Sequence, residues 1–123
     1  MTHIKKDLGQ YGEDLAADFL KRQGYKILER NFRNKLGEVD IVAAEKDVIC
    51  FIEVKTRRTP LCGTPFEAIS SAKQFKLGQL ALSYLKYKKL LDRAARFDVV
   101  AVFKNENNQD QVEIIKNAFD FPA

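Results

Sequence analysis

The hydrophobic positions near the N-terminus follow the period of an α-helix. Apolar side chains recur every three to four residues from Asp7 to Gln23, which predicts one amphipathic helix over this range. Asp7 and Gln10 have the spacing of a capping box, and Gly24 suits a left-handed helix stop. We therefore expect the chain to begin with a helix that packs one face on a core.

After this helix the pattern changes to that of strands separated by turns. Tyr25–Arg33 loses the helical period and is followed by the turn-forming sequence Asn34-Lys35-Leu36-Gly37. Glu38–Glu45 alternates between apolar and polar residues, and Val48–Lys55 is rich in the β-branched residues of a central strand. Lys46-Asp47 forms the tight turn between them. Three successive strands are predicted.

The second half of the chain contains a loop, a second helix and further strands. Thr56–Pro65 contains two prolines and a glycine and is expected to be a loop. Ser71 and Gln74 have capping-box spacing at the start of a long helix that ends near Leu90. Its expected apolar face consists of Phe75, Leu77, Leu80, Ala81, Tyr84 and Leu85.

Two further strands, Phe97–Phe103 and Val112–Ile115, complete the order α-β-β-β-α-β-β. The chain has 123 residues, of which 46% are hydrophobic, enough for one core and too few for two ordinary domains. We expect a single α/β domain over residues 1–123, without internal repeats.

Composition excludes several kinds of protein. The N-terminus lacks the long apolar segment of a secretion signal or a membrane span, so a soluble, cytoplasmic protein is expected. Cys50 and Cys62 form neither a disulfide framework nor the paired spacing of a zinc site. His3 is the only histidine, which argues against triads and histidine-rich metal centres. Catalysis would have to use carboxylates, lysines or arginines.

The net charge of +4 is a weak indication of a polyanionic partner. Between Lys73 and Arg96, seven basic residues stand against the single acid Asp92. A solvated helical face explains this run by itself, and only proximity to an active site would make it a binding surface. Tyr84 and Tyr87 among these lysines fit either stacking on bases or packing on the protein.

The predicted strands bring two acids and a lysine together. Because side chains alternate along a strand, Glu53 and Lys55 share one face. A two-residue turn at Lys46-Asp47 places Asp40 opposite Glu53, with Cβ atoms about 5 Å apart. Facing carboxylates require a raised pKa or a compensating cation, for which Mg²⁺ or Mn²⁺ is the natural candidate. Lys55 would then hold the attacking water or the developing phosphate charge.

Two stretches, Gly37-Glu38-Val39-Asp40-Ile41-Val42-Ala43 and Phe51-Ile52-Glu53-Val54-Lys55-Thr56-Arg57, resemble the signature of the PD-(D/E)xK nuclease superfamily, with Val39 where a proline would stand. Over nearly its whole length the chain resembles the YraN-like family of bacterial proteins, similar in pattern to archaeal Holliday junction resolvases. Further matches are Gly12-Glu13, Arg30-Asn31, Gly63-Thr64-Pro65, Arg96-Phe97-Asp98-Val99-Val100 and Asn117-Ala118-Phe119.

The resemblance implies a restriction-endonuclease-like fold, with a central mixed five-stranded sheet flanked by helices. It also implies that Glu13, Asp40 and Glu53 bind Mg²⁺ or Mn²⁺ and that Lys55 is the catalytic lysine. Lys73 or Gln74 would add a phosphate contact. The expected activity is metal-dependent hydrolysis of phosphodiester bonds in DNA, with branched or damaged structures as candidate substrates.

Several alternatives remain open at this point. A Glu-x-Lys pair alone is commonly an ion pair on a solvated face, and Glu13 lies at the border of its helix face, where glutamates are often simply solvated. Asp98 fits either a site carboxylate or an ion pair. The competing functions are a non-catalytic nucleic-acid-binding module and an interaction protein with an acidic partner, and a homodimer is one candidate oligomeric state. The residues expected to bind phosphates are Arg57, Arg58, Lys73, Gln74 and Lys76.

Overall fold

The computed structural model describes residues 4–57, 69–104 and 110–121. The predicted order of elements, α-β-β-β-α-β-β, is confirmed. The elements are α1 (Ile4–Arg22), β1 (Lys26–Asn34), β2 (Gly37–Glu45), β3 (Val48–Arg57), α2 (Ser71–Tyr87), β4 (Ala95–Phe103) and β5 (Gln111–Phe119).

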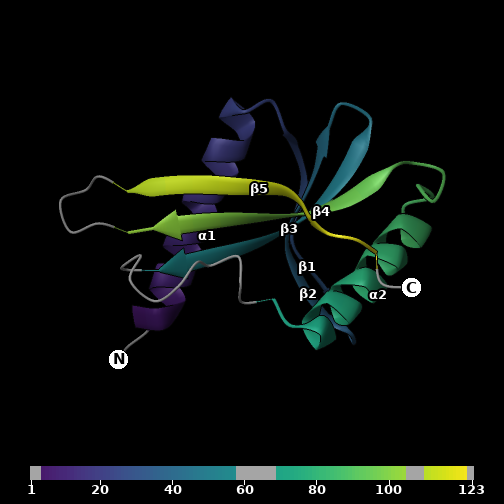
Figure 1. Cartoon of the computed structure of the whole chain (residues 1–123), viewed down its shortest axis with the longest axis horizontal. Helices are drawn as coiled ribbons and strands as arrows, with labels where there is room; N and C mark the ends of the chain where they lie inside the picture. Colours follow the sequence, from purple (N-terminus) through teal and green to yellow (C-terminus); the bar gives the residue numbers. More distant parts are fainter. Residues whose placement is uncertain (1–3, 58–68, 105–109, 122–123) are drawn as a thin grey trace.

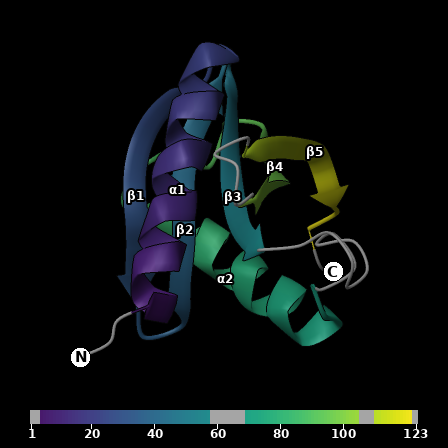
Figure 2. The same ribbon diagram turned by 90° about the vertical axis from the view of Figure 1, so that its left-hand side faces the viewer.

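The five strands form one mixed sheet in the order β1-β2-β3-β4-β5. Neighbouring strands are antiparallel except β3 and β4, which are parallel. A parallel pair needs a crossover connection, and the chain from β3 to β4 passes through α2 (Figure 1). In Figure 2, α1 lies in front of β1 to β3 while α2 lies behind them. The predicted α/β fold, a mixed five-stranded sheet flanked by helices, is confirmed.

Each face of the sheet carries its own hydrophobic core. The core beneath α1 includes Leu20, Ile52 and Val100, and the core beneath α2 includes Phe51 and Leu80. Neighbouring residues of β3 thus pack on opposite faces, as the period of a strand requires. Tyr84 of α2 belongs to the second core, where its ring meets Phe32 and Phe51 edge to face at centroid distances of 5.1 and 5.7 Å. Packing is therefore the role of Tyr84.

The second helix differs from its prediction at both ends. Its N-cap is Ser70, one residue earlier than expected, and Ser70 Oγ accepts a hydrogen bond from Lys73 N at 3.1 Å. The helix ends at Tyr87 and not at Leu90, because Lys89 takes a positive φ of 59° and Leu90 N donates to Leu85 O.

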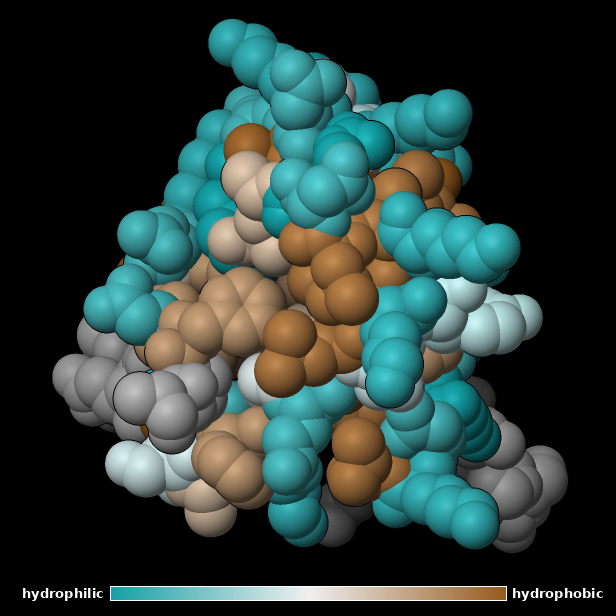
Figure 3. All heavy atoms as spheres, turned by 90° about the vertical axis from the view of Figure 1, so that its right-hand side faces the viewer, coloured by the Kyte–Doolittle hydropathy of each residue, from teal (hydrophilic) through white to brown (hydrophobic). Residues whose placement is uncertain are grey.

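The prediction that Phe75 lies on the buried face of α2 is wrong. Its side chain is 50% exposed, because the helix contacts the sheet along the stripe that contains Leu77, Leu80 and Tyr84. Leu82 and Tyr87 of α2 are also exposed. On the side of the molecule that carries α2, Figure 3 shows an apolar area bordered by hydrophilic side chains.

The remaining boundaries shift by a few residues. The predicted loop Thr56–Pro65 begins two residues later, since β3 continues through Arg57, and its other residues lie outside the described ranges. The last strand is longer than predicted, from Gln111 to Phe119. Within the described ranges, the structure contains no helix of the length and apolarity that a membrane span needs.

Candidate active site

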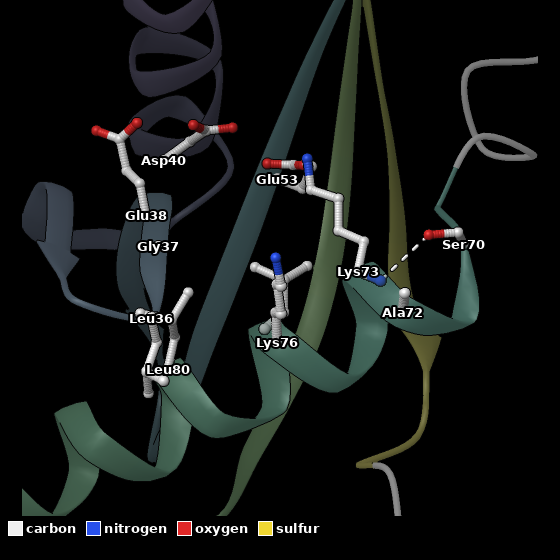
Figure 4. Close-up of a pocket in the computed structure, with 11 residues that line it drawn as sticks. Leu36, Gly37, Glu38, Asp40, Glu53, Ser70, Ala72, Lys73, Lys76 and Leu80 are labelled. Carbon is white, nitrogen blue, oxygen red and sulfur yellow. Dashed lines mark hydrogen bonds and ion pairs between the residues drawn. The ribbon is translucent and has the colours of Figure 1, made fainter.

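Asp40 and Glu53 lie beside each other where β2 and β3 begin to separate. The two strands pair from Glu45↔Val48 to Ile41↔Ile52, so the next position in the same register belongs to Asp40 and Glu53. Both acids line one pocket of about 500 Å³ between the sheet and α2. Figure 4 shows the two carboxylates at the same side of this pocket. The structure thus brings together the pair that the strand register predicted.

The carboxyl group of Asp40 binds a backbone amide of β3 just beyond the last paired residues of β2 and β3. Its Oδ2 accepts a hydrogen bond from Val54 N at 2.8 Å. Burial, together with the hydrogen bond and the negative charge of the Glu53 carboxyl, raises the pKa of Asp40 to about 8. The carboxyl group therefore keeps a proton near neutral pH unless a cation compensates its charge.

Glu53 is a buried carboxylate that faces two lysines. Only 6% of the residue is exposed. Its Oε2 forms an ion pair with the ammonium group of Lys73 and lies 3.8 Å from Lys55 Nζ. Neither contact has the geometry of a hydrogen bond, and Oε2 receives none from the described residues. The negative charge of this oxygen is therefore compensated by ammonium groups, without a hydrogen bond from the described residues.

Lys55 pairs with Glu53 from two residues further along β3, and its side chain is only slightly exposed. Burial lowers the pKa of Lys55, the charge of Glu53 opposes this effect, and the charges of Lys73 and Arg57 lower the pKa further. Its ammonium group belongs to the same cluster as the two acids, although the residue does not line the pocket wall that Asp40 and Glu53 share. The predicted Glu53–Lys55 pair on one strand face is present.

Glu13 approaches Asp40 from the other face of the sheet. Gly12 lets α1 come close to β3, because a Cβ atom at Gly12 would overlap the side chain of Thr56. Glu13 and Asp40 line a second pocket of about 260 Å³, together with Thr56. Asp40 thus lines both pockets, with Glu53 on one side and Glu13 on the other.

Two residues of β1 hold the Glu13 carboxylate. Arg30 donates from Nε and Nη2 to Oε1 at 3.2 and 3.1 Å, and Asn31 Nδ2 donates to Oε2 at 3.1 Å. Asn31 has a left-handed φ of 55°, which asparagine tolerates better than most residues. It stands opposite Asp40 in the register, between the pairs Arg30↔Ile41 and Phe32↔Val39. Sequence reasoning noted Arg30-Asn31 as a family match but did not find this positioning role.

The predicted phosphate contacts occupy different surroundings. Lys73 and Lys76 of α2 line the larger pocket and extend from the helix toward its acidic side (Figure 4). Gln74 instead donates from Nε2 to the carbonyl oxygen of Ile69 at 3.1 Å, just before the start of α2. Arg57 Nη1 donates to the carbonyl of Thr56 at 3.0 Å. Arg58 lies outside the described residues.

Whether the site could bind a divalent metal ion depends on the oxygen ligands that its side chains offer. In the part of the chain that the structure describes, no three acidic, cysteine or histidine side chains converge as a preformed ligand cluster. Asp40 and Glu53 supply neighbouring carboxylates, and hard divalent cations are commonly bound by one or two carboxylates with water. Glu13 is engaged with Arg30 and Asn31. The pair therefore fits Mg²⁺ or Mn²⁺, and the three-ligand set remains a prediction.

A separate buried cluster accounts for Asp98 and Arg96. Asp98 accepts hydrogen bonds from Arg96 Nε at 2.9 Å, Tyr25 Oη at 3.1 Å and Asn117 N at 2.9 Å. Arg96 also donates to Glu45 Oε1 at 2.6 Å. Of the two roles open for Asp98, the ion pair is the one observed. Arg96 consequently belongs to a buried network and not to the basic face of α2.

Comparison with known proteins assigns the family. The model of "Uncharacterised protein family UPF0102" matches residues 12–102, most of the chain. The chain belongs to the UPF0102 family. The family match confirms the predicted relationship to the YraN-like proteins. The matched range begins at Gly12 and contains Glu13, Asp40, Glu53 and Lys55.

UPF0102 proteins from several bacteria align with almost the entire chain. A UPF0102 protein of Clostridium botulinum strain Loch Maree is 49% identical over 97% of this chain and 98% of its own length. One from Geotalea uraniireducens is 47% identical over 94% of this chain and 91% of its own. One from Caldicellulosiruptor saccharolyticus is 49% identical over 94% and 98%, respectively. This UPF0102 chain and its relatives therefore share nearly their full lengths.

Proposed function

We propose that this UPF0102 protein is a divalent-metal-dependent phosphodiesterase that cleaves DNA in the cytoplasm. The observation that carries the proposal is the buried pair Asp40–Glu53 with Lys55 beside it. A buried pair of carboxylates in which one pKa is strongly raised, with lysines close by, is typical of active sites. The resemblance of the two strand motifs to the PD-(D/E)xK superfamily supports the same activity.

The residues of the pocket divide the work of phosphodiester hydrolysis. Asp40 and Glu53 would hold Mg²⁺ or Mn²⁺, an ion that lowers the pKa of bound water and polarises a phosphate. Lys55 donates hydrogen bonds to the attacking water or to the developing phosphate charge. Glu13, oriented by Arg30 and Asn31, supplies further negative charge next to Asp40.

The lysines of α2 provide the attraction for the DNA backbone. Lys73 and Lys76 line the pocket beside the acids, so a phosphate that enters meets two ammonium groups. Because Lys73 pairs with Glu53 in this structure, it exchanges that carboxylate for a phosphate oxygen when DNA is bound. Proximity to the acids thus gives part of the basic helix a role beyond solvation.

A second candidate function is a nucleic-acid-binding module without turnover. The Lys73–Glu53 ion pair favours it, because it compensates the buried carboxylate without any metal ion. The surroundings of Asp40 argue against this second function. Burial and Glu53 raise the pKa of Asp40, and among the described residues no basic side chain forms an ion pair with it. Acids that face a phosphate backbone weaken binding, so a module that only binds gains nothing from them.

The decisive experiment is incubation of the purified protein with linear, single-stranded, flapped and four-way DNA in Mg²⁺ or Mn²⁺. Cleavage that stops in EDTA and is absent in Asp40→Ala supports the phosphodiesterase. Equal trace cleavage by the wild type and Asp40→Ala indicates a contaminating nuclease and rejects the proposal. DNA binding that persists in that case favours the binding module.

A further inference from the structure

The pocket that contains Asp40 and Glu53 has two chemically different ends. At one end are the acids, with Lys73 and Lys76 reaching toward them from α2. At the other end are the side chains of Leu36, Leu77 and Leu80. Figure 4 shows Leu36 and Leu80 together, on the far side of Lys76 from Lys73. Phosphodiester hydrolysis uses the first end and leaves the leucines without a role.

The apolar end is open to solvent. Leu36, in the turn between β1 and β2, is 42% exposed, while Leu77 and Leu80 form a buried floor. Gly37 lies next to Leu36 with a φ of 142°, a backbone conformation that favours glycine. A Cβ atom at this position would stand 3.5 Å from Leu80 Cδ1, so the absence of a side chain keeps this end wide.

The size and chemistry of the pocket match a single nucleotide. Its volume of about 500 Å³ lies within the range of roughly 300–1,000 Å³ found for small-molecule sites. A phosphate suits the ammonium groups of Lys73 and Lys76, and the flat apolar faces of a base suit the three leucines. Glu38 lines the pocket beside Asp40 (Figure 4), and Arg33 holds its carboxylate at 2.8 Å.

We infer that this pocket is a subsite for one unpaired nucleotide of a DNA strand, with its phosphate at Lys73 and Lys76 and its base against Leu36, Leu77 and Leu80. The inference rests on the proposed DNA substrate. A base within a continuous duplex is stacked on both sides and cannot enter, whereas an unpaired base leaves the stack at little cost. DNA with unpaired bases, as in bulges, flaps and single strands, is therefore the substrate class.

Binding without metal tests the subsite separately from catalysis. The probe is a duplex with one unpaired 2-aminopurine in a bulge, compared with the same duplex without the bulge, in EDTA. We expect the wild type to prefer the bulged DNA by about tenfold, the effect of roughly 1.4 kcal/mol of apolar burial. The emission of 2-aminopurine should change on binding. Equal affinity for both duplexes would overturn the inference.

Leu36→Ser removes the exposed wall of the apolar end and should abolish most of the preference for bulged DNA. Leu91→Ser is the matched control, because Leu91 also lies in an exposed turn but does not line the pocket. Affinity for the continuous duplex should be unchanged in both variants. An equal loss of preference in the two variants would contradict a specific subsite.

A second measurement requires no variant. In the labelled wild-type protein, deoxyadenosine monophosphate should shift the amide resonances of Leu36, Gly37 and Leu80, while deoxyribose 5-phosphate should shift only those near Lys73. Identical shifts with both compounds would overturn the inference. A bulge preference without cleavage in Mn²⁺ would reject the phosphodiesterase and retain the subsite, and cleavage without a preference would do the reverse.

Discussion

The sheet carries two buried polar clusters, and they are built on opposite principles. Around Asp98, the carboxylate receives hydrogen bonds from Arg96, Tyr25 and the backbone of Asn117. Around Glu53, by contrast, one carboxylate adjoins another, and Oε2 faces the ammonium group of Lys73 in an ion pair but receives no hydrogen bond from the described residues. Buried polar groups are normally satisfied, and exceptions need an explanation. The contrast separates a cluster that stabilises the fold from one that remains available for ligands.

The pKa shifts of the two clusters agree with this contrast in their contacts. Hydrogen bonds from Lys116 and Arg96 lower the pKa of Glu45, so its charged form is stabilised. Burial and Glu53 raise the pKa of Asp40 to about 8, so its charged form is destabilised. A negative group that the protein itself does not stabilise is suited to a cation from solution.

The largest expected difference between the clusters is in stability. Arg96→Ala should lower the free energy of unfolding by about 3 kcal/mol, because it leaves the Asp98 carboxylate buried and without its ion pair. Asp40→Asn should cause no loss at pH 8, since it removes a destabilised charge. Urea unfolding of both variants measures the difference, and equal destabilisation would erase the distinction between the clusters.

The next largest effect concerns Lys55. If it stabilises the transition state, Lys55→Ala should slow cleavage by about 100-fold while DNA affinity stays nearly unchanged. Single-turnover rates and fluorescence anisotropy separate the two quantities. Arg93→Ala serves as the control, because this arginine contacts the carbonyl of Asp47 at the far end of the β2–β3 hairpin. A proportional loss of affinity and rate would assign Lys55 to DNA binding alone.

A smaller effect is the pH dependence of stability that Asp40 causes. The folded protein holds this proton up to a pKa of about 8, whereas the unfolded chain releases it near pH 4, at about the ordinary value of the side chain. The stabilisation is therefore complete below about pH 4 and is lost as pH rises toward 8. Unfolding free energies of the wild type minus those of Asp40→Asn should therefore fall as pH rises across this range. A flat difference would show that the charge of Asp40 is compensated.

The smallest expected change is in metal affinity. Lys73→Gln removes the ammonium group that competes for Glu53, so Mn²⁺ should bind about fivefold more tightly, as calorimetry can measure. Lys76→Gln is the matched control from the same pocket wall and should give a smaller gain, because no ion pair links Lys76 to Glu53 among the described contacts. Equal gains would indicate a general charge effect, and a loss would show that Lys73 assists the metal.

The pairing of Asp40 with Glu53 was predictable because both acids lie only a few residues from the turn that joins their strands. Once the Lys46-Asp47 turn was located, parity and register followed from strand geometry, and Asp40 had to meet Glu53. The same counting from the turn at Lys35 and Leu36 would have placed Asn31 opposite Asp40. The position of Asn31 opposite Asp40 was therefore predictable from the turn and the strand period alone.

Other features depended on packing that no local pattern records. The contact of Gly12 with Thr56 decides where Glu13 points, and it exists only after α1 has docked on the sheet. Likewise, the Lys73–Glu53 ion pair depends on the position of α2 after the crossover. The helical period included Phe75 in the apolar face, but the width of the stripe in contact with the sheet left it exposed. These are long-range effects.

The acid pair also has a consequence for how the protein folds. Asp40 and Glu53 belong to one hairpin closed by a tight turn, whereas β3 and β4 pair only after α2 has crossed the sheet. Contacts close in sequence form early, and non-local parallel pairs form late. The two carboxylates therefore meet while the chain is still largely open, and refolding should accelerate as pH falls toward about 4, where Asp40 becomes neutral in the unfolded chain.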